Sequence, residues 1–216
     1  MVNSQQQSKA LTLLAQMISV LLHPVFIPLI SSLLWYGFYP QYFASIAQIK
    51  ITDWLIMLII NTIIFPLLLI LLLKGLGFIK SILMKETKER IIPLIGVMVF
   101  YFWMYYVVKN KETNAPEPAI VFFLGNYLSI IALFIATMFL KVSLHACAAS
   151  FALAFAILLS IMSHSIVVPY LILVSVLAAL ILWARYYLKA HSVKELGVGA
   201  ALGVLAAITA YVYHIL

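Results

Sequence analysis

Residues 118–140 read PAIVFFLGNYLSIIALFIATMFL, a run in which no side chain carries a charge. A helix needs about 20 mostly apolar residues to cross the hydrocarbon core of a bilayer, and this stretch meets that length. Comparable runs follow one another along the chain, in which 66% of the residues are hydrophobic and 9% are charged. Because a soluble domain carries roughly 25% charged residues, the composition predicts a protein embedded in a lipid bilayer.

The apolar runs predict a series of membrane segments joined by short connections. They are long and continuous, which favours helices over the short alternating strands of a membrane β-barrel. The expected fold class is therefore all-α, a polytopic transmembrane helix bundle of about 6–7 helices. Residues 1–216 are expected to form a single integral membrane domain. The segments cover residues 10–38, 52–74, 91–109, 118–140, 143–163, 166–188 and 195–216.

The first segment differs from the others because prolines interrupt it at His23-Pro24 and again at Pro28. Proline removes a backbone donor and clashes with the preceding turn of a helix. Non-helical backbone at membrane depth has to be buried in protein or line a cavity. Two alternatives fit this pattern, one kinked helix or a broken, re-entrant segment.

Basic residues give the chain a formal net charge of +7, and most of them lie in loops at one membrane face. This pattern is typical of the positive-inside rule and of contact with anionic headgroups, so we expect no nucleic-acid partner. The single cysteine, Cys147, excludes an intramolecular disulfide and a cysteine-based metal cluster. The face that is poor in basic residues holds Lys50, Lys109 and Lys111, and the basic face holds Lys9, Lys74, Lys80, Lys85, Lys88, Arg90, Lys141, Arg185, Lys189 and Lys194.

Residues 184–195, ARYYLKAHSVKE, carry the side chains best suited to chemistry. If the last helix begins here, His191 and Glu195 lie one turn apart on the same face. A carboxylate that accepts the proton of one imidazole nitrogen leaves the other nitrogen basic, so the histidine can act as a nucleophile toward phosphorus. The structural alternative is a capping box with Ser192 as N-cap and Glu195 three residues later, and both interpretations can hold together.

Two further elements share the basic face with His191. Arg90 and Arg185 are the only arginines, and a guanidinium binds phosphate through two parallel hydrogen bonds. Ser143 can cap a helix whose first amides favour an anion, and His145 can protonate a leaving oxygen. The alternatives are ordinary positive-inside anchoring for the arginines and a structural role for His145.

In their order along the chain, these residues resemble the type-2 phosphatidic acid phosphatase superfamily of membrane lipid phosphatases. The motifs of that family are Lys-x6-Arg-Pro, Pro-Ser-Gly-His and Ser-Arg-x5-His-x3-Asp. The third motif resembles Arg185, His191 and Glu195, with glutamate in place of aspartate and Ala184 in place of serine. All three phosphatase-like motifs fall within residues 80–200.

The second motif departs further from the family pattern, because Val142 and Leu144 replace its proline and glycine while Ser143 and His145 are kept. Glycine lets backbone approach a phosphate closely, which a leucine side chain can prevent. These departures leave two alternatives, an active phosphatase and a relative without catalytic activity.

The first motif is the least similar of the three. Arg90 is kept, but its proline comes late, at Pro93. Leu83 stands at the family's lysine spacing, so Lys85 or Lys88 would have to supply that positive charge.

The resemblance implies a mechanism in which His191 attacks phosphorus, Glu195 orients His191, and His145 protonates the departing lipid oxygen. Water would then hydrolyse the phosphohistidine. The phosphate oxygens would be held by the four residues Arg90, Arg185, Ser143 and Lys85. The resemblance implies no metal and no cofactor.

The expected substrate is a membrane phospholipid phosphate or a polyprenyl phosphate or diphosphate, and the expected location is a bacterial cytoplasmic (inner) membrane. Charge counting places the motifs on the cytoplasmic face, whereas bacterial members of the family place them outside. The alternative functions are a catalytically inactive lipid-phosphate-binding or scaffold protein, a small transporter, and a haem-bearing membrane protein that uses paired histidines.

Overall fold

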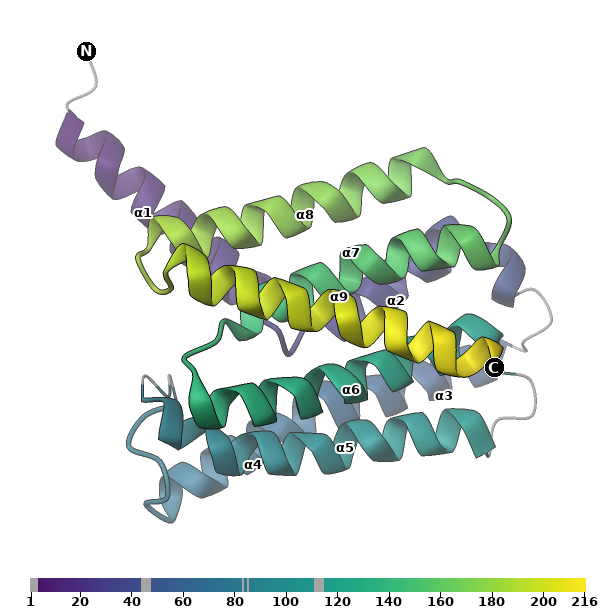
Figure 1. The fold of residues 1–216 in the computed structure, drawn as a ribbon, viewed down its shortest axis with the longest axis horizontal. Helices are drawn as coiled ribbons and strands as arrows, with labels where there is room; N and C mark the ends of the chain where they lie inside the picture. The colour runs from purple at the N-terminus through teal and green to yellow at the C-terminus, as the bar shows by residue number, and fades with distance from the viewer. Residues whose placement is uncertain (1–3, 44–47, 83, 85, 111–114) are drawn as a thin grey trace.

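The computed structural model describes residues 4–43, 48–82, 84, 86–110 and 115–216, and the secondary structure of this part of the chain is helical, without strands. Figure 1 shows the helices running alongside one another as a bundle, which confirms the all-α prediction. In chain order the elements are α1 (Ser4–Leu21), α2 (Ile27–Phe38), the 3-10 turn η1 (Pro40–Phe43), α3 (Gln48–Ile59), the π-helical turn η2 (Ile60–Ile64), α4 (Phe65–Gly75), the 3-10 turn η3 (Thr87–Arg90), α5 (Ile91–Asn110), α6 (Glu117–Phe139), α7 (Leu144–Met162), α8 (Val168–Tyr187) and α9 (Val193–Ile215).

Within the described residues, 6 helical stretches are long and apolar enough to cross a membrane. They agree with the segments expected from the sequence, apart from the first one. The chain is therefore an integral membrane protein. The six stretches are Ile51–Gly75, Thr87–Asn110, Glu117–Phe139, Leu144–Met162, Val168–Tyr187 and Val193–Ile215.

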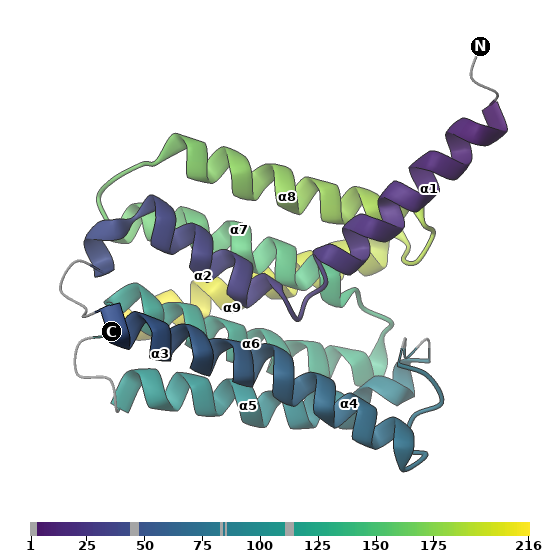
Figure 2. The same ribbon diagram turned by 180° about the vertical axis from the view of Figure 1, so that it is seen from behind.

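The first expected segment forms two short helices, α1 and α2, separated at His23-Pro24, and so it is broken rather than one kinked helix. The α-helical bonding of α1 stops after Leu22 N, which donates to Ile18 O at 2.9 Å, and His23 N donates instead to Val20 O at 3.3 Å. Pro24 has no N–H with which to continue the ladder. From this corner α2 runs into the bundle while α1 extends outward toward the N-terminus, as Figure 2 shows.

A second irregularity lies inside the Ile51–Gly75 span, where η2 adds a π-helical turn just before Pro66. Such a turn relieves the clash that proline makes with the preceding turn. The side chains of Asn61 and Thr62 donate to Met57 O and Leu58 O, both at 2.8 Å, and so satisfy carbonyls of the helix. The span therefore continues through the proline.

The centre of the bundle is α7, which packs against α9, α8 and α6. In its membrane window 61% of the residues are buried, against 28% for α8. Helix α9 approaches α7 closely because it presents glycines there: a Cβ built on Gly199 would lie 2.5 Å from Ser143 O, and one on Gly203 would lie 2.2 Å from Cys147 O. Small residues four apart allow this contact between membrane helices.

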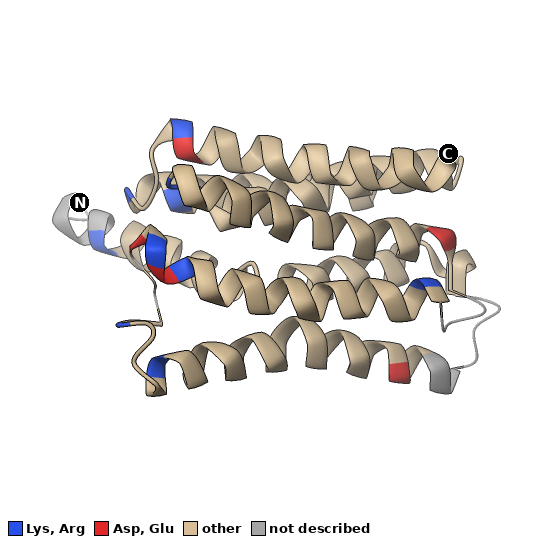
Figure 3. Cartoon of the chain, turned by 60° about the horizontal axis from the view of Figure 1, so that its bottom comes forward, with Lys and Arg blue, Asp and Glu red and all other residues tan. Residues whose placement is uncertain are grey.

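Charged side chains concentrate at one end of the bundle. Figure 3 shows most lysines and arginines at the end where α8 passes into α9, while the C-terminus lies at the other end. This end also holds the start of α7 and the turn between α4 and α5 (Figure 1). The fold thus gathers the basic residues on one face, as the sequence predicted.

Candidate functional site

The start of α7 is the point where the three phosphatase-like elements meet. Ser143 is fully buried and caps α7, because its Oγ accepts a hydrogen bond from Ala146 N at 3.3 Å. The backbone N–H of Ser143 donates to the carbonyl of Glu195 at 3.4 Å. This bond ties the second element to the third, next to the close contact at Gly199.

His191 and Glu195 form the hydrogen bond that their spacing suggests. His191 Nδ1 lies 2.8 Å from Glu195 Oε2, and the ring is buried, with 7% of the residue exposed. Because an ionised carboxylate only accepts, Nδ1 carries the proton and Nε2 keeps its lone pair. Such a ring is oriented and basic at Nε2, as nucleophilic catalysis requires.

Glu195 has two further partners. It closes a capping box with Ser192, donating its backbone N–H to Ser192 Oγ at 3.2 Å and accepting from Ser192 N at 3.4 Å. Lys141 Nζ lies 3.7 Å from Glu195 Oε2. Both interpretations of the spacing therefore hold: the carboxylate caps α9 and orients His191.

The turn between α8 and α9 places Arg185 and His191 at the same end of the bundle. Helix α8 ends in a Schellman arrangement, in which Ala190 N donates to Arg185 O at 3.2 Å and Lys189 N donates to Tyr186 O at 3.0 Å. Lys189 takes a left-handed conformation with φ 51. The chain then reverses within a few residues, so the arginine and the histidine stay neighbours.

Arg90 joins the first element to the second. Its Nε donates to Met84 O at 2.9 Å and its Nη1 donates to Val142 O at 3.2 Å. The guanidinium therefore links η3 to the residue just before Ser143. A guanidinium has five N–H donors, so these two bonds do not exhaust its capacity.

Both arginines affect the pKa of His191. Burial lowers the pKa of His191, and the positive charges of Arg185 and Arg90 lower it further, while the hydrogen bond to Glu195 opposes the shift. The net direction is downward, so the imidazole stays neutral at a pH where an ordinary histidine takes up a proton. A neutral imidazole beside two cations suits attack on an anionic group.

His145 and Arg185 share one partner, Ser19 of α1. His145 Nε2 lies 3.0 Å from the Ser19 carbonyl oxygen, and Arg185 Nη1 donates to Ser19 Oγ at 3.4 Å. The ring of His23 packs edge-on against His145, with centroids 5.1 Å apart. Arg185 Nε is buried and has no hydrogen-bond acceptor among the described residues. None of the three phosphatase-like motifs includes Ser19. In the sequence, only His23, a polar side chain before Pro24 in an apolar segment, indicated that the first segment could contribute to a site.

The structure thus brings together His191, Glu195, Ser143, Arg90, Arg185 and His145. Lys85, the remaining expected phosphate ligand, and Leu83 lie outside the described residues. Leu144, the replacement for the motif glycine, is partly buried against Leu133, Val142 and Cys147.

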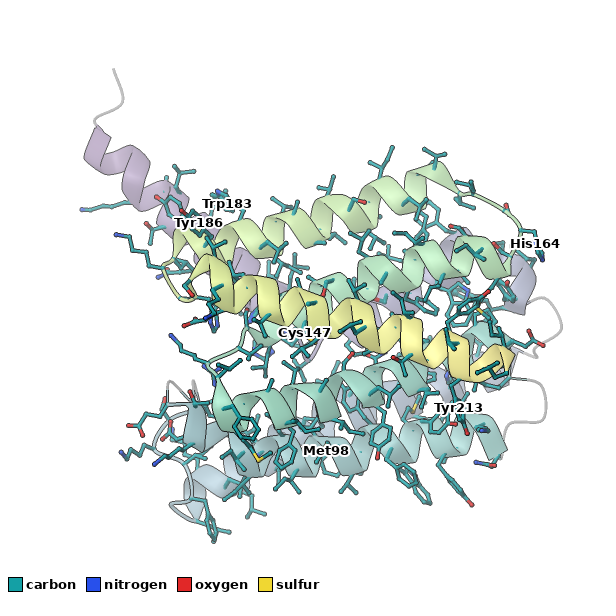
Figure 4. The ribbon with its side chains drawn as sticks, in the orientation of Figure 1. Met98, Cys147, His164, Trp183, Tyr186 and Tyr213 are labelled. Atoms are coloured by element: carbon teal, nitrogen blue, oxygen red, sulfur yellow. The ribbon has the colours of Figure 1, made fainter. Side chains whose placement is uncertain are left out.

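Trp183, Tyr186 and His164, which are not part of this group, lie at the ends of the predicted membrane segments. Figure 4 shows Trp183 and Tyr186 at the end of α8 near the site and His164 at the opposite end of the bundle. Tryptophan and tyrosine at helix ends are typical of the membrane interface.

Comparison with known proteins gave no match: no family model, no curated protein and no solved structure is similar to this chain.

Proposed function

We propose that the chain is a membrane-embedded phosphohydrolase of lipid phosphates, a divergent member of the type-2 phosphatidic acid phosphatase superfamily. The observation that carries the proposal is the 2.8 Å hydrogen bond between His191 Nδ1 and Glu195 Oε2. This bond orients a buried imidazole whose pKa is lowered by the positive charges of Arg185 and Arg90. An oriented base next to two phosphate-binding side chains is the arrangement that phosphoryl transfer to histidine needs.

The reaction takes place in two displacements. First, the lone pair of His191 Nε2 attacks phosphorus, an N–P bond forms, and the P–O bond to the lipid breaks. His145, in its protonated form, gives a proton to the departing lipid oxygen. Water then attacks the same phosphorus, the N–P bond breaks, and His145 takes the proton that the water releases. The products are inorganic phosphate and the lipid alcohol, or the lipid monophosphate where the substrate is a diphosphate. Glu195 holds Nδ1–H of His191 throughout.

The phosphate oxygens are held by side chains that still have donors free. Arg185 Nε has no acceptor among the described residues, and Arg90 engages only Nε and Nη1 in the recorded bonds. Ser143 stands at the start of α7, where the helix dipole favours an anion. Negative charge grows on the phosphate oxygens toward the transition state, so these contacts strengthen as the reaction proceeds. We also assign Lys85 to this group, on the family resemblance.

The substrate is a phosphorylated membrane lipid, either a phospholipid phosphate or a polyprenyl phosphate or diphosphate. The basic end of the bundle supports this choice, because most lysines and arginines gather there (Figure 3) and such residues attract anionic lipid headgroups. The membrane we propose is the cytoplasmic membrane of a bacterium. No metal ion or cofactor takes part in the steps above.

The test is phosphate release from a panel of lipid phosphates by the detergent-purified protein with a chelator present. We expect release by the wild type and its loss, by at least about 1,000-fold, in His191→Ala, because the nucleophile is gone. His164→Ala, a histidine at the opposite end of the bundle (Figure 4), is the matched control and should keep full activity. A folded wild type that binds these lipids without releasing phosphate would instead identify a lipid-phosphate-binding relative.

A further inference from the structure

The first segment contributes to the site a residue that the phosphatase-like motifs do not include. Ser19 lies near the end of α1 and is buried, with 8% of the residue exposed. Its two oxygen atoms contact two different members of the site, His145 and Arg185. We propose that Ser19 is a positioning residue, which orients His145 through its carbonyl and Arg185 through its hydroxyl. The part of this inference that concerns catalysis rests on the proposed phosphohydrolase function.

The carbonyl of Ser19 is available because α1 is broken at this point. In a continuous helix, the N–H of His23 would donate to the Ser19 carbonyl four residues earlier. Here the N–H of His23 donates to Val20 O instead, and Pro24 cannot extend the ladder. The break at His23-Pro24 therefore frees one buried carbonyl, and His145 Nε2 satisfies it at 3.0 Å.

This contact determines which nitrogen of His145 carries the proton. A carbonyl oxygen only accepts, so Nε2 donates to Ser19 and Nδ1 is the nitrogen left to exchange a proton with substrate. The edge-on ring of His23 restricts the imidazole from a second side. Ser19 thus serves His145 as Glu195 serves His191: in each pair an oxygen acceptor holds one ring nitrogen and leaves the other for the reaction.

The hydroxyl of Ser19 acts on Arg185. It accepts from Nη1 at 3.4 Å, a long bond, while Nε on the same guanidinium stays without an acceptor among the described residues. Nη1 is thus tied to α1, and the planar geometry of the group then fixes where Nε points. The free Nε is the donor that we assign to a phosphate oxygen.

The variant that tests the carbonyl is Pro24→Ala. An alanine at this position can donate to Val20 O, which lets His23 N–H return to Ser19 O and competes with His145. We expect kcat toward a lipid phosphate to fall at least about tenfold, with KM nearly unchanged, because the displaced His145 transfers protons in the two chemical steps and does not bind the substrate. The burst of p-nitrophenolate that accompanies phosphohistidine formation from p-nitrophenyl phosphate should hardly change, since this leaving group departs without a proton. Pro28→Ala, a second proline in the same segment, is the control.

The hydroxyl is tested by Ser19→Ala, with Ser32→Ala as the control from the neighbouring helix. Loss of one long bond to a charged group should lower kcat/KM about threefold, and Ser19→Thr, which keeps the hydroxyl, should restore it. An increase in activity in Ser19→Ala would overturn the proposal, because it would mean that Ser19 obstructs the substrate.

A measurement that does not depend on turnover separates this inference from the proposed function. In 15N-histidine-labelled protein, at a pH where the His145 ring is neutral, we expect His145, assigned by its loss in His145→Gln, to be the Nε2–H tautomer in the wild type and in Ser19→Ala. In Pro24→Ala the signal should shift toward a mixture of tautomers. An unchanged tautomer in a folded Pro24→Ala would overturn the carbonyl role, whether or not the wild type hydrolyses lipid phosphates. Failure of the wild type to hydrolyse any substrate would overturn the proposed function alone.

Discussion

Glu195 performs two tasks with one carboxylate at the start of α9. It accepts from His191 Nδ1 at 2.8 Å and closes the capping box with Ser192. A glutamine in its place can still accept from Ser192 N, so the helix start survives. The same glutamine carries no charge and can present its amide N–H₂ to the ring, which leaves the tautomer of His191 unfixed.

Glu195→Gln should therefore lower kcat by about 100-fold and leave the melting temperature within a few degrees of the wild type. Steady-state phosphate release and a thermal melt of the same preparation provide the two readings. Glu117→Gln, which changes the first turn of α6 at the other end of the bundle, should alter neither. Equal losses of stability and activity in Glu195→Gln would show that the carboxylate matters for the fold alone.

The protonation of His191 is the second property that belongs to single residues. Burial and the charges of Arg185 and Arg90 lower its pKa in the folded protein, whereas in the unfolded chain the pKa returns to about 6.5. The unfolded state thus binds the proton more readily, so this group stabilises the fold above about pH 6.5 and loses that contribution as the pH falls through the folded pKa.

Replacing Arg185 by glutamine removes one of the positive charges that act on His191, so the pKa of His191 should rise. A histidine titration by 15N NMR measures this directly. Lys189→Gln, at the same turn between α8 and α9, removes a charge that is not among those acting on His191 and should leave its titration in place. A fall in the pKa of His191 in a folded Arg185→Gln protein would contradict the proximity of Arg185 to His191.

Among the helices, the contact between α7 and α9 decides the geometry of the site. Gly199 and Gly203 let α9 touch the backbone of α7 at Ser143 and Cys147. The sequence holds the signal for this contact, two glycines four apart, which apolar periodicity alone does not reveal. Hydropathy predicted where the spans lie, because each span must be about 20 apolar residues long, but it carries no information about which helices touch.

Gly199→Ala and Gly203→Ala should each lower the stability of the protein by about 1–3 kcal/mol, since the added methyl has to push against backbone atoms. Gly197→Ala is the matched control: its Cβ would meet nothing within 4 Å, and alanine favours the helix by about 1 kcal/mol. Thermal unfolding in detergent should rank Gly197→Ala at or above the wild type and the other two below it. The same melting temperature for all three variants would contradict the close packing of α7 and α9.

The broken first segment is a second case in which the sequence predicted the helices but not their contacts. His23-Pro24 predicted an interruption, and the break between α1 and α2 confirms it. Pro28 lies in the first turn of α2 and does not interrupt that helix. The sequence alone did not show that the interruption frees the carbonyl of Ser19, because that consequence depends on which nitrogen donor lies opposite in the folded bundle. Likewise, the proximity of Arg90, Ser143 and His145 to the third motif depends on how the helices pack, which the sequence alone does not show.

For the whole molecule, the distribution of charge predicts an orientation in the membrane. Most lysines and arginines, the candidate site among them, lie at the end opposite the C-terminus (Figure 3). Translocation disfavours basic loops, so this end is expected on the cytoplasmic side. Site residues account for only part of this positive charge, because the same face also holds Lys9, Lys74, Lys80, Lys88, Lys141, Lys189 and Lys194.

Single-cysteine labelling with a membrane-impermeant maleimide tests this orientation in intact bacterial cells. The native Cys147 is buried, so it should not react. A cysteine replacing Lys80, whose side chain is 81% exposed, should be protected until the membrane is permeabilised. A cysteine replacing Glu117, 79% exposed at the other end, should react at once. The reverse pattern would place the site outside and assign the positive charge to substrate binding.

In the proposed mechanism His191 carries the phosphoryl group between lipid and water, and this step can be tested by trapping that group on the protein. The purified protein is mixed with 32P-labelled phosphatidic acid or polyprenyl phosphate and quenched in alkali within a turnover. We predict a protein-bound label that survives alkali, is released by acid, maps to the peptide containing His191, and is absent from His191→Gln. Phosphate release by the wild type that persists in His191→Gln, with no label on the protein, would contradict the mechanism.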